Sequence, residues 1–293
     1  MEKQIRTIRM DTLKKVCADP TGITGVVIGH ENCPHFYRQS NVDEMIQLAL
    51  QAGLQVRVNL PVLFEEYLEE FKGEAVRLLT AYPGVKLIIN DWGLLYYLHG
   101  AHPDAKFVAG KGISFTYGDN PWNEHILKAE KEKYQEMLKA HNMENPDTIS
   151  QLKQLGVDEI ELSDLELSDR AYQHLKSEGF TVTVNQGMSV VTMSRACHCL
   201  RFLNKCGEMG NCIQYCTKEI ILSIQQYYDM INTELKPLSV ETKAMQPDMI
   251  VNGNITMVRN DRVASDTSHI DVMIYDERLF DLAELLPVMA RQT

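Results

Sequence analysis

The sequence predicts an α/β fold of the (β/α) TIM-barrel type, on two observations. Over the first two-thirds of the chain, short apolar runs rich in valine and isoleucine alternate with amphipathic segments, which is typical of strands and helices in a buried parallel sheet. Several amphipathic segments end in glycine just before the next apolar run, as helices do before a strand. Six strand–helix units in tandem favour a closed barrel over an open, doubly wound sheet.

Each expected strand of this series is a run of four to six residues. The strands are Gly25–Gly29, Gln55–Leu60, Val85–Asn90, Lys106–Ala109, Glu159–Leu162 and Phe180–Val184. The expected helices are Val42–Ala52, Leu63–Ala81, Leu94–Leu98, Glu124–Ala140, Thr148–Leu155 and Asp169–Ser177. Beyond Cys216 the pattern changes, and we expect a helix over Glu219–Ile231, β segments over Met249–Val258 and His269–Ile274, and a closing helix over Leu279–Ala290. Without an internal repeat or a linker, residues 1–293 should form one domain.

The composition indicates a globular protein of the cytoplasm. The chain is 44% hydrophobic and 24% charged, which is ordinary for a folded domain. No apolar run approaches the roughly 20 residues that cross a bilayer. The first 16 residues are rich in charge and lack the apolar stretch of a secretory signal. We therefore expect no membrane span and a cytoplasmic location, where thiols stay reduced.

The charge balance argues against a dedicated nucleic-acid-binding protein. The formal net charge is -11, whereas proteins that grip phosphate backbones usually carry a basic excess. Basic residues do gather locally, as at Arg195, Arg201 and Lys205. The sequence as a whole nevertheless predicts that nucleic acid is not the partner.

Five of the seven cysteines are concentrated in one short stretch of the chain. They are Cys197, Cys199, Cys206, Cys212 and Cys216. A single cysteine such as Cys17 is readily explained as a small buried apolar side chain. Several reduced thiols packed together are prone to oxidation, so the cluster predicts a metal centre.

The spacing of these cysteines favours an iron–sulfur cluster over zinc. Cys212 and Cys216 are four residues apart, so on a helical turn both thiolates face the same way. A glycine-containing stretch before them lets the chain fold back towards Cys197 or Cys199. Four thiolates hold either structural zinc or an iron–sulfur cluster. Zinc usually takes two closely spaced pairs, and only the Cys212–Cys216 pair is of that kind.

A fourth ligand is available far away in the sequence. Cys33 follows the first expected strand, at the C-terminal face of a (β/α) barrel, where active sites form. The loop after the sixth expected strand opens onto the same face. The geometry of the barrel therefore permits Cys33 to meet the later cysteines.

Motifs around the cysteines resemble those of a known family. The chain reads Val-Asn-Gln-Gly from Val184, then Met-Ser-Arg-Ala-Cys up to Cys197, then the Cys212–Cys216 pair. This order resembles the collagenase-like peptidase family (unknown-type family U-32), whose motif runs Phe-Val-His-Gly, Tyr-Ser-Gly-x-Cys and Cys-x-x-x-Cys. The similarity spans about residues 23 to 290. Further matches are Gly29–Cys33, Asn90–Gly93, Phe107–Gly110, Leu165–Ser168, Asn252–Gly253 and Ile270–Val272.

The resemblance implies a ligand set and a cofactor. It is closest to small, single-domain members that hold a four-iron, four-sulfur (4Fe–4S) cluster with one cysteine after the first strand and three in the later motif. Carried over to this chain, the ligands are Cys33, Cys197, Cys212 and Cys216. Cys199 competes with Cys197 for one position, and Cys206 has no counterpart. Zinc remains the alternative metal.

The resemblance also implies a function. Those small members act in oxygen-independent hydroxylation of a quinone precursor, as a heterodimer with a second family member, so a similar small aromatic substrate and a partner are expected. Gln186 stands where the family has a histidine, and Val182 stands where the family has an acidic residue four positions earlier. Both differences argue against a peptidase activity. A peptidase and a purely structural metal-binding partner protein remain the alternatives, and the resemblance assigns no catalytic residue.

Other polar residues near the ends of the expected strands have simpler interpretations. Asp91 is expected to cap the following helix, with a substrate contact as the alternative. Glu161, Asp164 and Glu166 lie near the end of the fifth expected strand, and some of them are expected to be solvated charges. His30 is expected to be an ordinary loop or core histidine. The Gly110–Gly112 stretch resembles half of a dinucleotide-binding fingerprint, but Phe115 stands where the third glycine would be.

Overall fold

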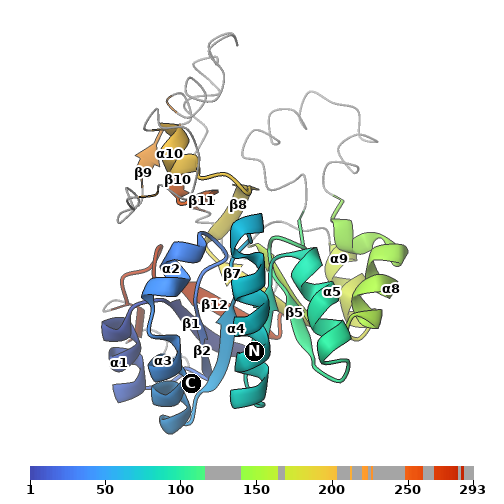
Figure 1. Ribbon diagram of the computed structural model, residues 1–293, viewed down its shortest axis with the longest axis horizontal. Coiled ribbons are helices and arrows are strands. Elements are labelled where there is room, and N and C mark those ends of the chain that lie inside the picture. Colours follow the sequence, from blue (N-terminus) through green and yellow to red (C-terminus); the bar gives the residue numbers. More distant parts are fainter. Residues whose placement is uncertain are drawn as a thin grey trace.

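The computed structural model describes residues 1–115, 140–163, 169–202, 212, 220–223, 226, 248–259, 267–282 and 285–286. In this part of the chain eight strands form a closed barrel in the order β1-β12-β7-β6-β5-β4-β3-β2 (Figure 1). Every neighbouring pair runs parallel. The predicted TIM-barrel-like α/β fold is therefore confirmed.

The barrel is surrounded by helices, and a smaller antiparallel sheet of order β8-β11-β10-β9 stands apart from it. The barrel strands are β1 (Glu2–Thr7), β2 (Gly25–Ile28), β3 (Gln55–Asn59), β4 (Lys86–Ile89), β5 (Phe107–Ala109), β6 (Val157–Ser163), β7 (Thr181–Gln186) and β12 (Val272–Asp276). The small sheet consists of β8 (Met188–Met193), β9 (Ile220–Leu222), β10 (Met249–Asn252) and β11 (Ile255–Arg259). The described helices are α1 (Met10–Ala18), α2 (Pro34–Gln39), α3 (Val42–Gln51), α4 (Leu68–Ala81), α5 (Trp92–Ala101), α8 (Pro146–Gln154), α9 (Asp169–Ser177) and α10 (His198–Phe202), with 3-10 turns η1 (Glu65–Tyr67) and η3 (Asn142–Glu144).

The first barrel strand, β1, is absent from the sequence prediction. Its residues are polar except for Ile5, yet Gln4, Arg6 and Thr7 are fully buried. A polar strand of this kind lacks the apolar run by which the other strands were recognised. Because β1 was missed, the predicted sixth strand is the seventh strand of the chain, β7. The cysteine-rich segment therefore follows β7, and Cys33 follows the second strand, β2.

Most of the elements that the sequence predicts agree with the structure to within a few residues and three differ, whereas α1, α2, β8 and α10 were not predicted. Residues 65–67 form the 3-10 turn η1, so α4 begins at Leu68. The helix expected over Glu219–Ile231 is wrong at its start, because residues 220–222 form β9 and pair with β10. The β segment expected over Met249–Val258 is a hairpin whose turn contains Gly253. The helix expected over Glu124–Ala140 lies outside the described residues except for its last residue, as does half of the closing helix expected over Leu279–Ala290.

The interior of the barrel is layered. An apolar layer is formed by five residues from four strands: Val27, Ile88, Val108, Val272 and Ile274. On one side of this layer Arg57 forms an ion pair with Glu159, whose side chain is 1% exposed. On the other side, at the C-terminal ends of the strands, lies a larger group of buried charges. The apolar layer thus separates two polar clusters inside one barrel.

Between β7 and β12 the chain leaves the barrel and builds the small sheet. β7 ends at Gln186, and β8 begins two residues later, after Gly187 with a φ of 72°. Figure 1 shows β8 to β11 and α10 beyond the end of the barrel that carries α2. The cysteine-bearing segment is therefore held over the C-terminal mouth of the barrel.

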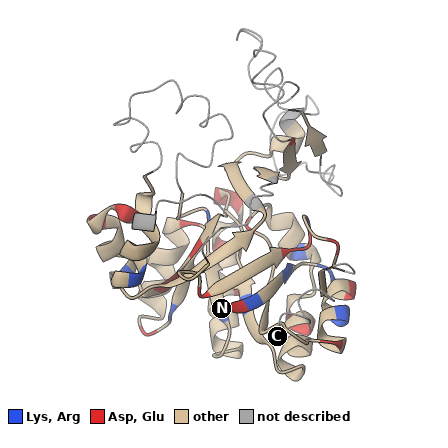
Figure 2. Ribbon diagram, turned by 180° about the vertical axis from the view of Figure 1, so that it is seen from behind, with Lys and Arg blue, Asp and Glu red and all other residues tan. Residues whose placement is uncertain are grey.

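Two surface properties bear on the expected partners. Lys and Arg are interspersed with Asp and Glu over the described helices and strands (Figure 2). Among the described helices, none is both long and apolar enough to cross a bilayer.

Candidate functional site

The turn between β10 and β11 brings Cys33 and Cys197 to one place. Gly253 in this turn has a φ of 62°, and a Cβ added there would lie 3.1 Å from the Cβ of Cys33. The Cys197 thiol lies 3.5 Å from the Gly253 carbonyl oxygen and donates to it. Both cysteines are buried. Two thiols that are 164 positions apart in the sequence (197 − 33) therefore approach the same glycine.

Backbone contacts fix the segment around Cys197 on this turn. The Gly253 carbonyl oxygen also accepts the backbone N–H groups of His198, at 2.8 Å, and Cys199, at 3.1 Å. On the other side of the turn, the Asn32 amide donates to the Asn252 side chain. Hydrogen bonds to the turn therefore connect the loop after β2 to the start of α10.

The electrostatic surroundings of Cys197 favour a thiolate, the form that binds metals. A hydrogen bond with the Cys199 side chain is the main cause that lowers the pKa of Cys197 to about 7, against the opposing effect of burial. Backbone N–H groups of Leu200 and Cys199 act in the same direction. Cys199 is itself buried beside Cys197. Either of the two thus remains available as a ligand.

The predicted ligand set is only partly within the described residues. Cys212 is described and half-buried, whereas Cys206 and Cys216 lie outside them. Within the described ranges, no group of three histidine, cysteine or acidic side chains is arranged to hold a metal ion. The set Cys33, Cys197, Cys212 and Cys216 therefore stays a prediction.

A hydrogen-bond chain runs through His198 beside the cysteines. The His198 Nε2 atom lies 2.9 Å from the Ser194 Oγ, and its Nδ1 atom lies 2.9 Å from the Thr256 Oγ1. The Ser194 hydroxyl also lies 2.9 Å from the Ala196 carbonyl oxygen, to which it can donate. This chain connects the Cys197 segment to β11 and orients it.

A buried charge network lies at the C-terminal mouth of the barrel. We use this name for Arg6, Glu31, Lys111, Glu161, Asp276 and Arg278. Arg6 donates to Glu31 at 3.1 Å and to Glu161 at 2.7 Å. Arg278 donates to Glu31 at 2.8 Å and to Asp276 at 2.6 Å. Three cationic and three anionic side chains are therefore packed together out of contact with water.

These neighbours keep the carboxylates ionised despite their burial. Burial alone would raise the pKa of Glu31, but the positive charges of Arg278, Lys111 and Arg6 hold it well below the ordinary value. Burial also tends to raise the pKa of Asp276, but the positive charge of Arg278 outweighs burial, so this pKa is lowered. Arginine is suited to this role because its planar fork holds two acceptors at once.

His30 lies next to the network and is held neutral. Burial is the main cause that lowers its pKa to about 3, and the charge of Arg278 adds to it. The nearby Asp276 carboxylate, 4.0 Å from Nε2, opposes this effect without reversing it. His30 is thus a core histidine, as expected from the sequence.

The neutral state of His30 predicts acid destabilisation. In the unfolded chain His30 takes up a proton near pH 6.5, whereas in the folded protein it does so only near 3. Because the unfolded state then binds more protons, the free energy of unfolding should fall as the pH decreases from 6.5. Urea titrations at several pH values above 4.5, the ordinary value of Glu31, measure this slope.

In the variant His30→Gln, the free energy of unfolding should fall less between pH 6.5 and 4.5 than it does in the wild type. His141, whose pKa burial lowers to about 4, titrates in the same window and supplies the matched comparison as His141→Gln. An unchanged slope in the His30 variant would contradict the prediction.

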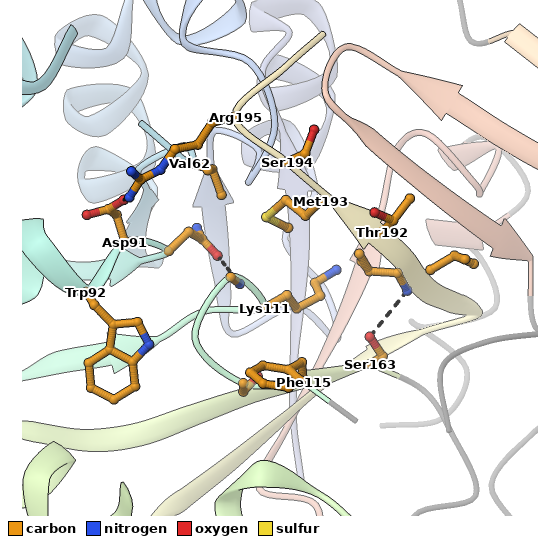
Figure 3. A pocket seen from close by; sticks show the side chains of 15 residues that line it. Val62, Asp91, Trp92, Lys111, Phe115, Ser163, Thr192, Met193, Ser194 and Arg195 are labelled. Atoms are coloured by element: carbon orange, nitrogen blue, oxygen red, sulfur yellow. Dashed lines mark hydrogen bonds and ion pairs between the residues drawn. The ribbon is translucent and has the colours of Figure 1, made fainter. Parts of the chain in front are cut away.

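A pocket opens beside the network and below the Cys197 segment. Its volume is about 530 Å³. It is lined by Val62, Asn90, Asp91, Trp92, Lys111, Gly112, Ser114, Phe115, Ser163, Val190, Val191, Thr192, Met193, Ser194 and Arg195. Figure 3 shows Trp92, Phe115 and Met193 around the cavity, with Lys111 among them. Ser194 and Arg195 belong both to the pocket and to the approach to Cys197.

Asp91 has the capping role that the sequence predicts and a second role as well. One carboxylate oxygen accepts the backbone N–H groups of Gly93, at 2.9 Å, and Leu94, at 3.1 Å. The other forms an ion pair with Arg195 at 3.0 Å, although the Arg195 side chain is 72% exposed. The capping prediction is confirmed, and the ion pair ties the Cys197 segment to the rim of the barrel.

The sequence prediction left open which of Glu161, Asp164 and Glu166 are solvated, and it missed most of the network. The Glu161 side chain is 1% exposed and is not solvated charge. Arg6, Lys111 and Arg278 were not singled out at all. Their common signal is a charged residue within or just after a barrel strand, but that signal is recognisable only once the strand ends are known.

Fold and site together define a (β/α) barrel protein whose described residues include three buried cysteines, a charge network and a pocket at its C-terminal mouth. No known family profile matches the sequence, and no curated protein matches it. Among solved structures, one described as a U32 peptidase is similar over 94% of this chain and 92% of its own, with 11% identity and a TM-score of 0.45. The function must therefore be read from the residues of this chain.

Proposed function

We propose that the protein holds a 4Fe–4S cluster and assists the oxygen-independent hydroxylation of a quinone precursor or a similar aromatic substrate. The observation that carries this proposal is that Cys33 and Cys197 both approach Gly253. Among the members of the collagenase-like peptidase family, this sequence most resembles the V component of oxygen-independent ubiquinone hydroxylation. A second family member as heterodimeric partner belongs to the same proposal.

The surroundings of the two cysteines fit a cluster. Both thiols are buried, and hydrogen bonds around Cys197 stabilise its thiolate. Cys212 and Cys216 complete the proposed ligand set, with Cys199 as the competitor of Cys197 and zinc as the alternative metal. When bound, such a cluster supplies single-electron transfer, with a potential tuned by burial and nearby hydrogen bonds.

The pocket fits a small aromatic ligand next to such a centre. Trp92, Phe115 and Met193 contribute apolar and aromatic surface, and aromatic rings stack readily on such surfaces. The cavity of about 530 Å³ lies within the range of small-molecule sites. Because Ser194 and Arg195 line it, a ligand in the pocket would lie directly below the Cys197 segment.

Anaerobic purification tests the cofactor. We expect a brown protein with visible absorption and with iron and acid-labile sulfide in equal amounts. The variant Cys33→Ser should lose most of the iron, because it removes a ligand that no neighbouring cysteine replaces. Cys17→Ser is the matched control, since Cys17 lies against the Leu48 carbonyl oxygen, away from the Gly253 turn, and should keep the wild-type iron content.

Two results would reject the proposal. One is a colourless protein that contains stoichiometric zinc after anaerobic purification. The other is a Cys33→Ser variant that keeps both its fold, by circular dichroism, and the full wild-type content of iron and sulfide.

A peptidase is the second candidate, and one observation favours it. The Ser194 hydroxyl and the His198 Nε2 atom are 2.9 Å apart, which is the spacing of a nucleophile and its general base. Casein or gelatin cleavage that survives replacement of Cys212 and Cys216 by serine, but disappears in Ser194→Ala, would support this function over the first.

A further inference from the structure

Lys111 is a buried lysine in the wall of the pocket. Its side chain is 1% exposed, and no acceptor within the described chain forms a hydrogen bond with Nζ. The nearest carboxylate oxygens are those of Glu161, at 3.8 Å, and Glu31, at 3.9 Å. An ammonium group in that position has lost its water without gaining direct hydrogen bonds, which is unfavourable unless a ligand compensates.

The carboxylates near Lys111 already have other donors. Glu31 accepts from Arg6 and Arg278, and Glu161 accepts from Arg6 and, at 2.8 Å, from Asn185. The lysine therefore contributes charge to the network but is not needed for its hydrogen bonds. A lysine retained for charge alone leaves its nitrogen available to a molecule in the pocket.

The backbone at Lys111 is tightly held while its side chain is not. A Cβ at Gly110 or at Gly112 would collide with Asn90, and the Gly112 N–H donates to the Asn90 side chain at 3.0 Å. The loop after β5 is therefore fixed against β4. From this fixed point a flexible four-carbon stem carries the nitrogen, and Figure 3 shows it among the side chains that surround the cavity.

We propose that Lys111 forms a protonated Schiff base with the aldehyde or keto carbonyl of a small molecule in the pocket. The ammonium releases a proton, and the amine adds to the carbonyl carbon, so that a C–N bond forms. The carbonyl oxygen takes up two protons and leaves as water. The overall conversion is ammonium plus carbonyl to iminium plus water, which balances atoms and charge without an oxidant or a reductant.

The charge network explains why this product suits the site. Three cations balance three carboxylates before the reaction, and the iminium keeps the positive charge that Glu31 and Glu161 face. A neutral amide or amine product would leave one carboxylate without compensation. The network thus stabilises the ammonium and the iminium alike, and disfavours products that lack the charge.

The same surroundings make the amine reactive. Burial is the main cause that lowers the pKa of Lys111 to about 8, and the charges of Arg6 and Arg278 act in the same direction. Lysines beside other cations or out of water are the ones that serve as carbonyl nucleophiles in enzymes. Near pH 8 about half of Lys111 is then uncharged, whereas an ordinary lysine with a pKa near 10.4 is less than about 1% uncharged.

Reductive trapping tests the proposal. The full chain is incubated at pH 8 with 4-hydroxybenzaldehyde and sodium cyanoborohydride, and modified lysines are mapped by peptide mass spectrometry over time. We expect Lys111 to be labelled at an initial rate at least about tenfold above that of any other lysine, in line with its larger uncharged fraction. Labelling confined to exposed lysines, or saturable binding of the aldehyde without a trapped adduct, would overturn the proposal.

Variants separate this site from general reactivity and from the metal. Lys111→Arg keeps the charge and should abolish the fast labelling, whereas Lys86→Arg, at the opposite end of the barrel beside Asp158, should leave it unchanged. If Lys111→Arg does not fold, the peptide map of the wild type still shows whether Lys111 is labelled faster than the other lysines. Cys33→Ser should be labelled at the wild-type rate, so a protein without iron does not by itself count against Lys111.

Discussion

Replacing Arg6 with methionine should destabilise the protein by about 3–5 kcal/mol, the usual cost of removing one partner from a buried ion pair. Arg6 is fully buried and donates to both Glu31 and Glu161. Methionine fills similar space but leaves three carboxylates facing two cations. The uncompensated negative charge must then be neutralised by proton uptake or reached by water, and both require energy. Urea unfolding measured at pH 7 gives the change in free energy.

The exposed arginine Arg77 provides the matched control. It also contacts two carboxylates, those of Glu74 at 2.7 Å and Asp43 at 2.9 Å, but its side chain is 43% exposed. Surface pairs of this kind contribute about 0–1 kcal/mol, so Arg77→Met should have little effect. Similar losses in the two variants would show that burial of the network does not matter to stability.

Under the proposed function, replacing Gly253 with alanine should lower both the iron content and the stability of the protein. The φ of 62° disfavours an alanine at this position, by about 1–2 kcal/mol. The added Cβ would also lie 3.1 Å from the Cβ of Cys33, so one of them must move. Because the same residue accepts hydrogen bonds from the start of α10, that movement separates Cys33 from Cys197. Iron analysis and urea unfolding of the anaerobically purified variant measure both effects.

The variant Gly179→Ala separates strain from contact. Gly179 has a similar positive φ of 83°, but a Cβ there would meet nothing within 4 Å. It should therefore show the backbone strain alone, with a normal iron content. If Gly253→Ala keeps wild-type iron, the approach of Cys33 and Cys197 at this turn is not what holds the metal.

The barrel was predictable because most of its strands are apolar on both faces. β2 and β4 consist almost entirely of valine, isoleucine and leucine, so the sequence pattern itself marks them as buried parallel strands. β1 escaped because its inward side chains are Gln4 and Arg6, which are buried only through partners from other strands. Burial that depends on distant partners leaves no local pattern.

The same reasoning explains which parts of the site were predictable. The cysteines are dense in the sequence, and their chemistry is specific, so they were recognised directly. Arg6, Lys111 and Arg278 come from three separate elements and look like ordinary surface residues in isolation. Glu161 was not distinguished from its acidic neighbours Asp164 and Glu166, because acidic residues usually lie in solvent, and only the closed barrel places it opposite Arg6.

The position of β12 has a consequence for how the chain folds. This strand pairs with β1, more than 260 residues earlier in the chain (272 − 2), and with β7 on its other side. Until it is synthesised, β1 to β7 can form only an open sheet with two unpaired edges, and such edges recruit other chains. Closure over so long a separation is intrinsically slow. The cysteine segment emerges from the ribosome before closure, so a nascent chain carries reactive thiols and open edges at the same time.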